Sequence, residues 1–327
     1  MKLFSALLLL LCQQQSCVVN AGPGQQKWMQ VGGNIDGENA QDWAGGTEKG
    51  MAMNGAGTTI AVGSSGHDGS NGAVNSGHVR VFDLDDTGNW LLRGDAIEGE
   101  FAYDNSGTSV VLSADGMILG IGEPQSDAGK NTVDRKQIDF GQVRVFEWKA
   151  NQSKWVQRGE AITGETKYDF ASDGGGLAMD ASGTTIVIGA PFHDGDELYS
   201  KKGQVRVFDW EGTNWIQRGA DLLGEAAGDL FGEAVAINGS GDTVAVGALH
   251  NDGEAEAGRY GCVACHGSVR IFDWSSSGEE WLQRGNDIDG EQDKDFFGSS
   301  VALNAAGNMI VIGAPQTGDS SKRGLAY

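Results

Sequence analysis

Residues 203–248 read GQVRVFDWEGTNWIQRGADLLGEAAGDLFGEAVAINGSGDTVAVGA and contain one complete unit of a pattern that recurs along the chain. The unit has a Gly-x-Val-Arg-Val-Phe segment, a Trp segment that leads to Gly-Glu, a Val-rich segment and an apolar run that ends in Gly. The anchors, at intervals of 60 to 66 residues, are Trp28, Trp90, Trp155, Trp215 and Trp281. Self-similarity at a nearly fixed period indicates a repeat architecture.

Each unit predicts about four short strands and no helix. Val301–Leu303 and Met309–Ile312, for example, flank the turn Asn304–Gly307, where Gly supplies a positive φ at low steric cost. Antiparallel units of this size match the blades of a β-propeller, because each blade must pack on its neighbours to bury its faces. We therefore predict an all-β fold, a β-propeller of about five four-stranded blades. The alternative is an open β-solenoid, whose coils usually repeat at shorter intervals.

The ends of the chain suggest how the ring closes. The sequence starts with the Trp28–Glu38 strand of one unit and stops shortly after the Gly313–Pro315 strand of another, with Gly324–Tyr327 as a shortened third strand. We expect one propeller domain over residues 22–327, in which the N-terminal strand completes the last blade. A truncated larger ring is the alternative.

Residues 1–21 have the pattern of a signal peptide. Lys2 precedes the apolar run Leu3–Leu11, and Ala21 is the expected end of the segment. No later segment approaches the ~20 apolar residues of a membrane-spanning helix. We therefore predict a secreted chain without membrane insertion.

The formal net charge of −22 comes from Asp and Glu residues spread along the chain. Such a surface repels phosphate backbones and anionic headgroups, which argues against nucleic acid and leaves cations or neutral glycans as easier partners. We expect a monomer that binds an extracellular protein or glycan. The sequons at Asn151 and Asn238 predict glycosylation.

Several segments resemble the FG-GAP repeats of integrin α-chain propellers. They are Phe231-Gly232, Phe297–Ala302, Ile186–Pro191 and Ile310–Pro315. Together with the Trp-x-Gln-x-Gly and Val-Arg-Val-Phe segments, they look closest to secreted microbial and algal proteins with such repeats. The resemblance implies a propeller and a role in adhesion.

Calcium loops of that family, of Asp-x-Asp-x-Asp-Gly type, would lie in the turn between the Phe-Gly strand and the Gly-Ala-Pro strand. This sequence departs from the pattern, because its turns are short and poor in carboxylates. They are Asn54–Gly57, Ser113–Gly116, Asp180–Gly183, Asn238–Gly241 and Asn304–Gly307. We expect no cofactor, with calcium and haem c as alternatives, and the sequence leaves the metal unknown.

Histidines and acidic residues recur in the loop after the Gly-Ala-Pro strand. The candidate ligand-binding residues are His67, Asp68, His193, Asp194, Asp196, His250 and Asp252. Equivalent loops lie on one rim of a propeller, and loops on a rigid scaffold often carry binding residues. The alternative is that Asp-Gly and Asn-Asp only form turns and the histidines are ordinary surface residues.

Eight arginines occupy two repeated positions. One set is Arg80, Arg144, Arg206 and Arg270, and the other is Arg93, Arg158, Arg218 and Arg284. Repetition in every blade predicts an architectural role, in which each arginine pairs with a repeated carboxylate such as Glu100 or Asp209.

The segment Cys262-Val263-Ala264-Cys265-His266 has the spacing of a c-type haem attachment site. Three alternatives stay open: a local disulfide or free thiols, a haem bound through Cys262, Cys265 and His266, and a metal site with His250 as a fourth ligand. Nothing resembling a cytochrome surrounds the motif, which favours the first.

The chain has no nucleophile elbow, phosphate loop or metalloprotease helix, so the sequence nominates no catalytic residue. We predict a secreted, non-enzymatic propeller that recognises protein or glycan through loops on one rim. The alternatives are a haem or redox protein that uses Cys262, Cys265 and His266, and a propeller hydrolase with its site in the central channel.

Overall fold

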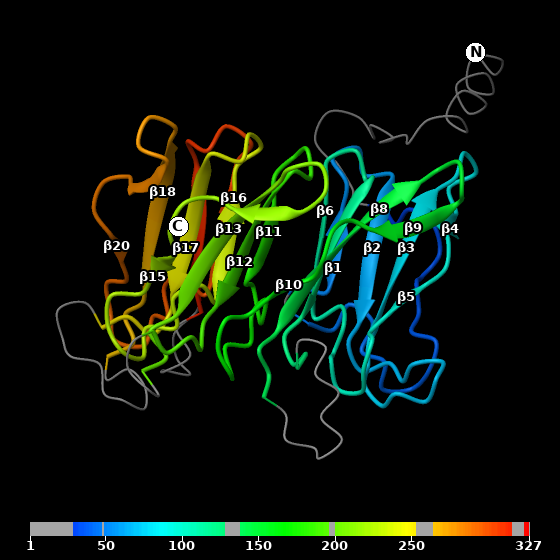
Figure 1. The fold of residues 1–327 in the computed structure, drawn as a ribbon, viewed down its shortest axis with the longest axis horizontal. Helices are drawn as coiled ribbons and strands as arrows, with labels where there is room; N and C mark the ends of the chain where they lie inside the picture. The colour runs from blue at the N-terminus through cyan, green and yellow to red at the C-terminus, as the bar shows by residue number, and fades with distance from the viewer. Residues whose placement is uncertain are drawn as a thin grey trace, which may run out of the picture.

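A computed structural model describes residues 29–47, 49–127, 138–195, 200–252, 264–315 and 324–326. It is a five-bladed β-propeller, in which every sheet is antiparallel (Figure 1). The described residues contain no helix, and none of them offers a segment long and apolar enough to cross a membrane as a helix. The predicted fold class is confirmed.

The blades are sheets of consecutive strands. Blade 1 contains β1 (Met51–Met53), β2 (Thr59–Ser64), β3 (His78–Leu84), β4 (Trp90–Leu92) and β5 (Ile97–Glu98). Blade 2 contains β6 (Ser109–Leu112), β7 (Ile118–Glu123), β8 (Gln142–Lys149), β9 (Lys154–Gln157) and β10 (Ile162–Thr163). Blade 3 contains β11 (Leu177–Met179), β12 (Thr185–Ala190), β13 (Gln204–Trp210), β14 (Trp215–Gln217) and β15 (Leu222–Leu223). Blade 4 contains β16 (Ala234–Ile237), β17 (Thr243–Ala248), β18 (Ser268–Ser275), β19 (Glu280–Gln283) and β20 (Ile288–Asp289). Blade 5 contains β21 (Ser300–Leu303), β22 (Ile310–Ala314) and β23 (Leu325–Ala326).

The first four blades have four strand positions, as predicted, but the outermost strand is broken into two short pieces. In blade 3, β14 and β15 both pair with β13, and Gly219 between them has a φ of +75°. A left-handed glycine at this point interrupts the strand at little steric cost. In blade 5, β23 pairs with β22 as the predicted short third strand.

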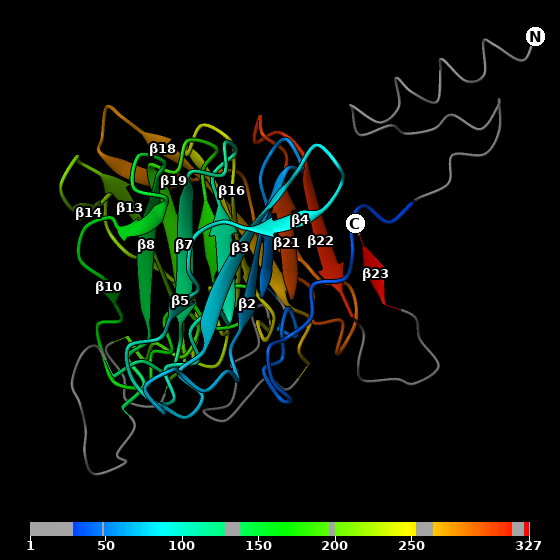
Figure 2. The same cartoon turned by 90° about the vertical axis from the view of Figure 1, so that its right-hand side faces the viewer.

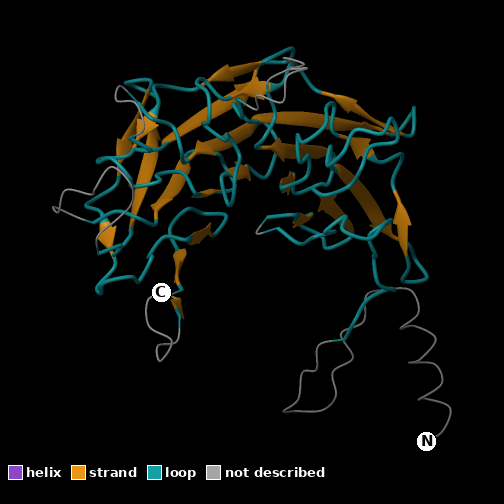
Figure 3. Cartoon of the chain, turned by 90° about the horizontal axis from the view of Figure 1, so that it is seen from below, coloured by secondary structure: helices purple, strands orange, loops and turns teal. Residues whose placement is uncertain are grey.

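Seen along its axis, the propeller places the five blades side by side along an arc, with blade 1 and blade 5 at its two ends (Figure 3). The core lies between the blades: Val205 and Val207 of blade 3, for example, pack with Val235, Val244 and Val246 of blade 4. These valines are almost completely buried. Burial at a shared interface is what a blade with two apolar faces requires.

The anchoring tryptophans link each blade to the segment before it. The indole Nε1 of Trp155 donates to the carbonyl oxygen of Arg93 at 3.1 Å, and Trp215 and Trp281 make the same bond one and two blades later. Trp90 donates to the carbonyl oxygen of Val31 at 3.0 Å. The first residues described thus occupy, against blade 1, the place of a preceding outer strand. Closure of the ring by Trp28–Glu38 stays a prediction, and Trp28 lies outside the described residues.

The repeated arginines are architectural, as predicted. Arg206 of β13 donates to the carbonyl oxygen of Thr163 in the preceding blade at 2.6 Å. Arg218, from the outer strand, pairs with Asp209 at 3.0 Å and donates to the carbonyl oxygen of Gly241, a turn residue of the next blade, at 2.7 Å. Each arginine therefore holds two neighbouring blades together.

The two ends of the propeller differ in their loops. Short turns such as residues 54–58 and 211–214 lie at one end. The other end carries the connection between the second and third strands of blade 1, residues 65–77, and the described ends of the matching connections in blades 2 to 4, together with the crossings into the next blade (Figures 1 and 2). We call this end the long-loop face.

Candidate functional site

Aspartates close the base of the long loops on the long-loop face. In blade 1, Asp68 accepts a hydrogen bond from the backbone nitrogen of Asn75 at 2.9 Å, and in blade 3 Asp194 accepts one from Lys201 at 3.1 Å. In blade 4, Asp252 accepts bonds from the backbone nitrogens of Ala264 and Cys265. Asp127 does the same in blade 2 for Ile138 and Asp139, although no histidine drew attention to it in the sequence. Each of these aspartates thus accepts hydrogen bonds from backbone nitrogens at the described end of its loop. Asp196 lies outside the described residues.

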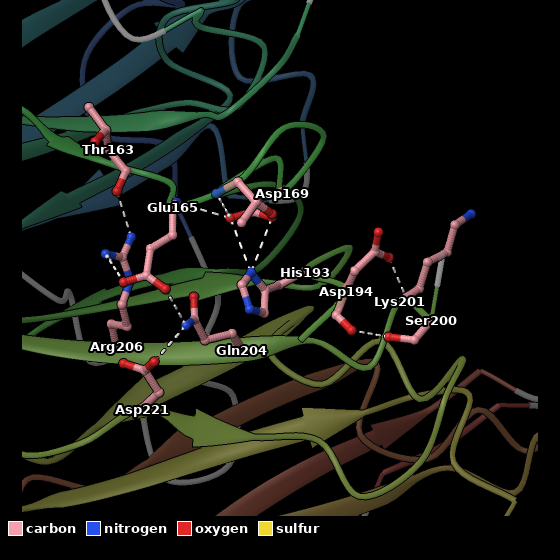
Figure 4. Close-up of polar contacts among 11 residues, drawn as sticks. Thr163, Glu165, Asp169, His193, Asp194, Ser200, Lys201, Gln204, Arg206 and Asp221 are labelled. Atoms are coloured by element: carbon pink, nitrogen blue, oxygen red, sulfur yellow. Dashed lines mark hydrogen bonds and ion pairs between the residues drawn. The ribbon is translucent and has the colours of Figure 1, made fainter. Parts of the chain in front are cut away.

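The two predicted histidines of blades 1 and 3 are buried beneath the loops. His193 Nδ1 lies 3.2 Å from both carboxylate oxygens of Asp169 (Figure 4), and His67 Nδ1 lies 3.2 Å from Asp42. Blade 4 has Asn251 in this place, with its amide 3.3 Å from Asp229. The polar pair is thus a repeated feature that joins a long loop to the crossing from the preceding blade.

The hydrogen bond between His193 and Asp169 shifts the pKa of both groups. The hydrogen bond to Asp169 raises the pKa of His193 above its ordinary value, although burial opposes the shift. Burial tends to raise the pKa of Asp169, but hydrogen bonds from His193 and Thr166 outweigh it and leave the pKa lowered.

His250 occupies a different position from the other two histidines. Aligned along the fold, the residue that corresponds to His193 is Asn251, because Asn251 carries the equivalent bond to Asp229. His250 instead packs beside Phe296, with ring centroids 5.8 Å apart, and burial lowers its pKa.

A second polar group lies next to the buried pair in blade 3 (Figure 4). The amide of Gln204 donates to Glu165 and to Asp221, both at 2.9 Å. Arg206 lies 3.5 Å from Glu165, whose side chain is 42% exposed. The strand β13 thus presents a ladder of polar side chains that reaches solvent between two blades.

Blade 2 buries the corresponding group. Glu123, at the end of β7, is fully buried and accepts bonds from Arg144 Nε at 2.8 Å and from Gln142 at 2.6 Å. The matching residues in blades 3 and 4 are Ala190 and Ala248. In blade 2 this carboxylate pairs with the repeated arginine inside the blade, whereas the alanines at its position in blades 3 and 4 are buried without a polar group.

Blade 4 has a cavity of about 430 Å³ beside its outer strand, which consists of β19 and β20. Its lining is polar throughout: Glu225, Asn251, Gln283, Gly285, Asn286, Asp287 and Asp289. Gln283 donates to Asp287 at 2.6 Å. Burial raises the pKa of Glu225 and of Asp289, and the nearby Asp287 carboxylate raises both further. The cavity offers closely spaced carboxylates and amides, which accept and donate hydrogen bonds and repel anions.

The central channel is apolar at its walls. A cavity of about 360 Å³ is lined by the inner strands β1, β6, β11, β16 and β21 of all five blades. Lys49 crosses its mouth and donates to the carbonyl oxygens of Gly175, Leu177 and Val235 at 2.8 to 2.9 Å, and burial lowers its pKa to about 8. Among the described residues of the lining, no carboxylate faces this cavity. The convergent carboxylates that a channel hydrolase would need are not found in this lining.

Cys265 is buried and disulfide-bonded, which is one of the alternatives that the sequence left open. The disulfide occupies a sulfur that a thioether to haem would require. Cys262 lies outside the described residues. His266 Nε2 lies 3.1 Å from Asp293 near the protein surface.

The two sequons differ in exposure. Asn151 is exposed in a turn, whereas Asn238 is buried and its side-chain oxygen accepts bonds from the backbone nitrogens of Asp242 and Thr243. Asn54 and Asp180 close the matching turns of blades 1 and 3 in the same way. The side-chain oxygens that close these turns are thus engaged by the backbone.

No known protein-family profile matches the chain, and no curated protein matches it in sequence. Among solved structures it is similar to a putative 6-phosphogluconolactonase from Bacteroides fragilis, with 12% identity over 78% of this chain and 60% of that chain and a TM-score of 0.45. It is also similar to the periplasmic gluconolactonase of Pseudomonas aeruginosa, with 12% identity over 80% of this chain and 63% of that chain and a TM-score of 0.48. The β-propeller domain of the Trilobed protease from Pyrococcus furiosus shows 13% identity over 85% of this chain and 66% of that chain and a TM-score of 0.44. The chain spans less than two thirds of each of these proteins, and the likeness carries no argument about activity.

Proposed function

We propose that the protein is a secreted, non-enzymatic binding module that recognises an extracellular glycan or protein through its long-loop face. The observation that carries this proposal is the polar cavity of blade 4, which is lined by the outer strand of that blade and by Glu225 and Asn251 of the long-loop face. The FG-GAP-like segments support a role in adhesion. The scaffold beneath the cavity is the tightly packed core between blades 3 and 4.

The lining of the cavity favours a neutral, hydroxyl-rich ligand. Asp287 and Asp289 supply acceptors for hydroxyl groups, and Asn286 supplies both a donor and an acceptor. Anionic ligands are disfavoured, because three carboxylates line the cavity and the net charge of the chain is −22. We therefore expect the glycan partner to be a neutral oligosaccharide.

Described residues beside the cavity are held by their own polar contacts. The Asp252 carboxylate accepts hydrogen bonds from the backbone nitrogens of Ala264 and Cys265, and the Asn251 side chain donates to Asp229. Groups that are fixed before a ligand arrives lose less entropy on binding, which favours higher affinity.

An array of neutral and anionic glycans tests the proposal with the chain from residue 22 onward. We expect binding to neutral oligosaccharides, weakened by Asp287→Ala and unchanged by Glu211→Ala. Glu211 is a suitable control because it is an exposed carboxylate in the turn between β13 and β14, at the opposite end of the propeller. If no neutral glycan binds, or if only anionic glycans bind, glycan recognition by this cavity is wrong.

A further inference from the structure

Blade 1 differs from the other blades at the first residue of its third strand. This residue is Gln142 in blade 2, Gln204 in blade 3 and Ser268 in blade 4, but it is His78 in blade 1. The His78 ring stacks on His67, with centroids 3.9 Å apart and an angle of 27° between the planes. Two imidazoles therefore lie together where the other blades have at most one.

A carboxylate from the N-terminal segment completes a cluster with the two imidazoles. One ligand atom from each of Glu38, His67 and His78 lies within 4.8 Å of the other two. The three residues come from different parts of blade 1: the crossing into the blade, the loop after β2 and the start of β3. The ligand atoms are close enough for one ion to bind all three once the stacked rings turn so that their nitrogens converge.

The hydrogen bonding of His78 points to a missing ligand. Its side chain is fully buried, and neither ring nitrogen has a hydrogen-bond partner among the described residues. Buried polar groups are almost always paired, so an imidazole with two free nitrogens needs an explanation. A metal ion provides one, because neutral imidazole nitrogen is a strong metal ligand.

Asp42 lies where it could support a metal-bound His67. Its buried carboxylate is 3.2 Å from His67 Nδ1, although the two groups do not meet hydrogen-bond geometry as they stand. A carboxylate on one ring nitrogen fixes the orientation of the imidazole and makes the other nitrogen a better ligand. Arg80 also lies near the cluster, 3.5 Å from Glu38, and donates to the carbonyl oxygen of Asp36. If Glu38 bound a metal ion, its 3.5 Å contact with Arg80 would be lost, but Arg80 would keep its hydrogen bond to the carbonyl oxygen of Asp36.

We propose that His67, His78 and Glu38 bind one Zn²⁺ ion, with water in the remaining position. Two histidines and one carboxylate with an open fourth position form a donor set typical of zinc, whereas calcium and magnesium prefer oxygen ligands. The ion would fasten the N-terminal segment to blade 1 through Glu38. This site is separate from the glycan cavity of blade 4, so each can be tested without the other.

The test uses the chain from residue 22 onward, without a polyhistidine tag, stripped of metal with a chelator and then desalted. Zn²⁺ is titrated by competition with a chromophoric chelator, and bound zinc per chain is counted by mass spectrometry. We expect one Zn²⁺ per chain and a rise in the unfolding temperature on binding. Calcium should not compete.

Two variants localise the ion. His78→Gln introduces the residue that blades 2 and 3 carry at this position, so it should fold, and we expect it to bind zinc at least about 100-fold more weakly. His193→Asn removes a histidine from blade 3 and should bind zinc like the original chain. The proposal is wrong if the original chain binds no zinc, or if His78→Gln binds it with unchanged affinity. A circular dichroism spectrum of each variant confirms that it is folded.

Discussion

Replacing Gly189 with alanine tests how closely neighbouring blades pack. Gly189 lies in β12, and its backbone approaches that of Gly232 in the crossing to blade 4. A Cβ on Gly189 would lie 2.9 Å from the carbonyl carbon of Gly232 and 3.1 Å from its Cα, and closer still to its carbonyl oxygen. Ordinary contact begins at 3.4 Å, so either β12 or the crossing that contains Gly232 must move. Both belong to the buried core, where movement is costly.

The expected cost follows from overpacking a well-packed interior, about 1–3 kcal/mol. The clash is with backbone, which cannot rotate away, so the cost should lie near the upper end of this range. Replacing a glycine also reduces the entropy of the unfolded chain, which returns about 0.4–1 kcal/mol. We expect a net loss of about 2 kcal/mol in the free energy of unfolding and a fall of roughly 4–8 °C in the unfolding temperature.

Thermal and guanidinium unfolding followed by circular dichroism measure this loss. Gly313→Ala is the matched control, because Gly313 holds the same position in blade 5 and its Cβ would meet only the Ser300 hydroxyl and, at 3.7 Å, that of Ser299. Rotation of Ser300 relieves that contact, so the control should unfold close to the original chain. Equal unfolding temperatures for Gly189→Ala and the original chain would refute the described packing between blades.

Two further substitutions test the polar contacts. His193→Asn should keep a bond to Asp169, as Asn251 keeps one to Asp229 in blade 4, but it should lose a pH-dependent contribution to stability. Folding raises the pKa of His193, so protonated His193 stabilises the folded chain. This contribution is complete below about pH 6.5 and disappears as the pH rises through the folded pKa. Guanidinium unfolding from pH 5 to 9 should therefore show the two proteins converging at high pH, and parallel curves would contradict this. Glu123→Ala leaves Arg144 buried without its carboxylate and should lower the free energy of unfolding by about 3–5 kcal/mol. Adding Arg144→Met removes the unpaired charge and should restore part of this loss. A loss below about 1 kcal/mol in chemical unfolding would show that the pair is not buried as described.

The repeat was predictable because strand structure depends on local patterns. In each Val-Arg-Val-Phe segment, buried valines alternate with an arginine. The pairing between strands also repeats: Ile188 lies opposite Arg206 in blade 3, and Val246 lies opposite Arg270 in blade 4. Glycine-rich turns at fixed offsets marked the hairpins. The pattern of a Trp segment leading to Gly-Glu does not predict the second short piece of the outer strand, which pairs with the same neighbour after Gly219.

The candidate site was harder to predict, because its contacts join residues far apart in sequence. His193 and Asp169 are 24 residues apart and meet only once the blade has formed. His250 was aligned with His193 by residue type, although the hydrogen bond to Asp229 shows that Asn251 is its counterpart. Comparison of the repeats position by position would have singled out His78, the one histidine where blades 2 and 3 have glutamine.

The contacts of Lys49 could not be predicted from the repeat pattern. No other unit has lysine at that position, and its three carbonyl acceptors lie in blades 3 and 4, more than 120 residues away. Only the curvature of the whole propeller brings them within reach. A sequence pattern with a period of about 60 residues contains no information on such a contact.

Calorimetry tests whether the long-loop face binds a neutral glycan through the cavity of blade 4. The oligosaccharide that binds best on the array is titrated into the original chain, Asp287→Ala and Glu211→Ala. Loss of a hydrogen bond to a charged carboxylate predicts about 10- to 100-fold weaker binding for Asp287→Ala, whereas binding to Glu211→Ala should be unchanged. Equal affinity for Asp287→Ala and the original chain would contradict glycan binding by this cavity.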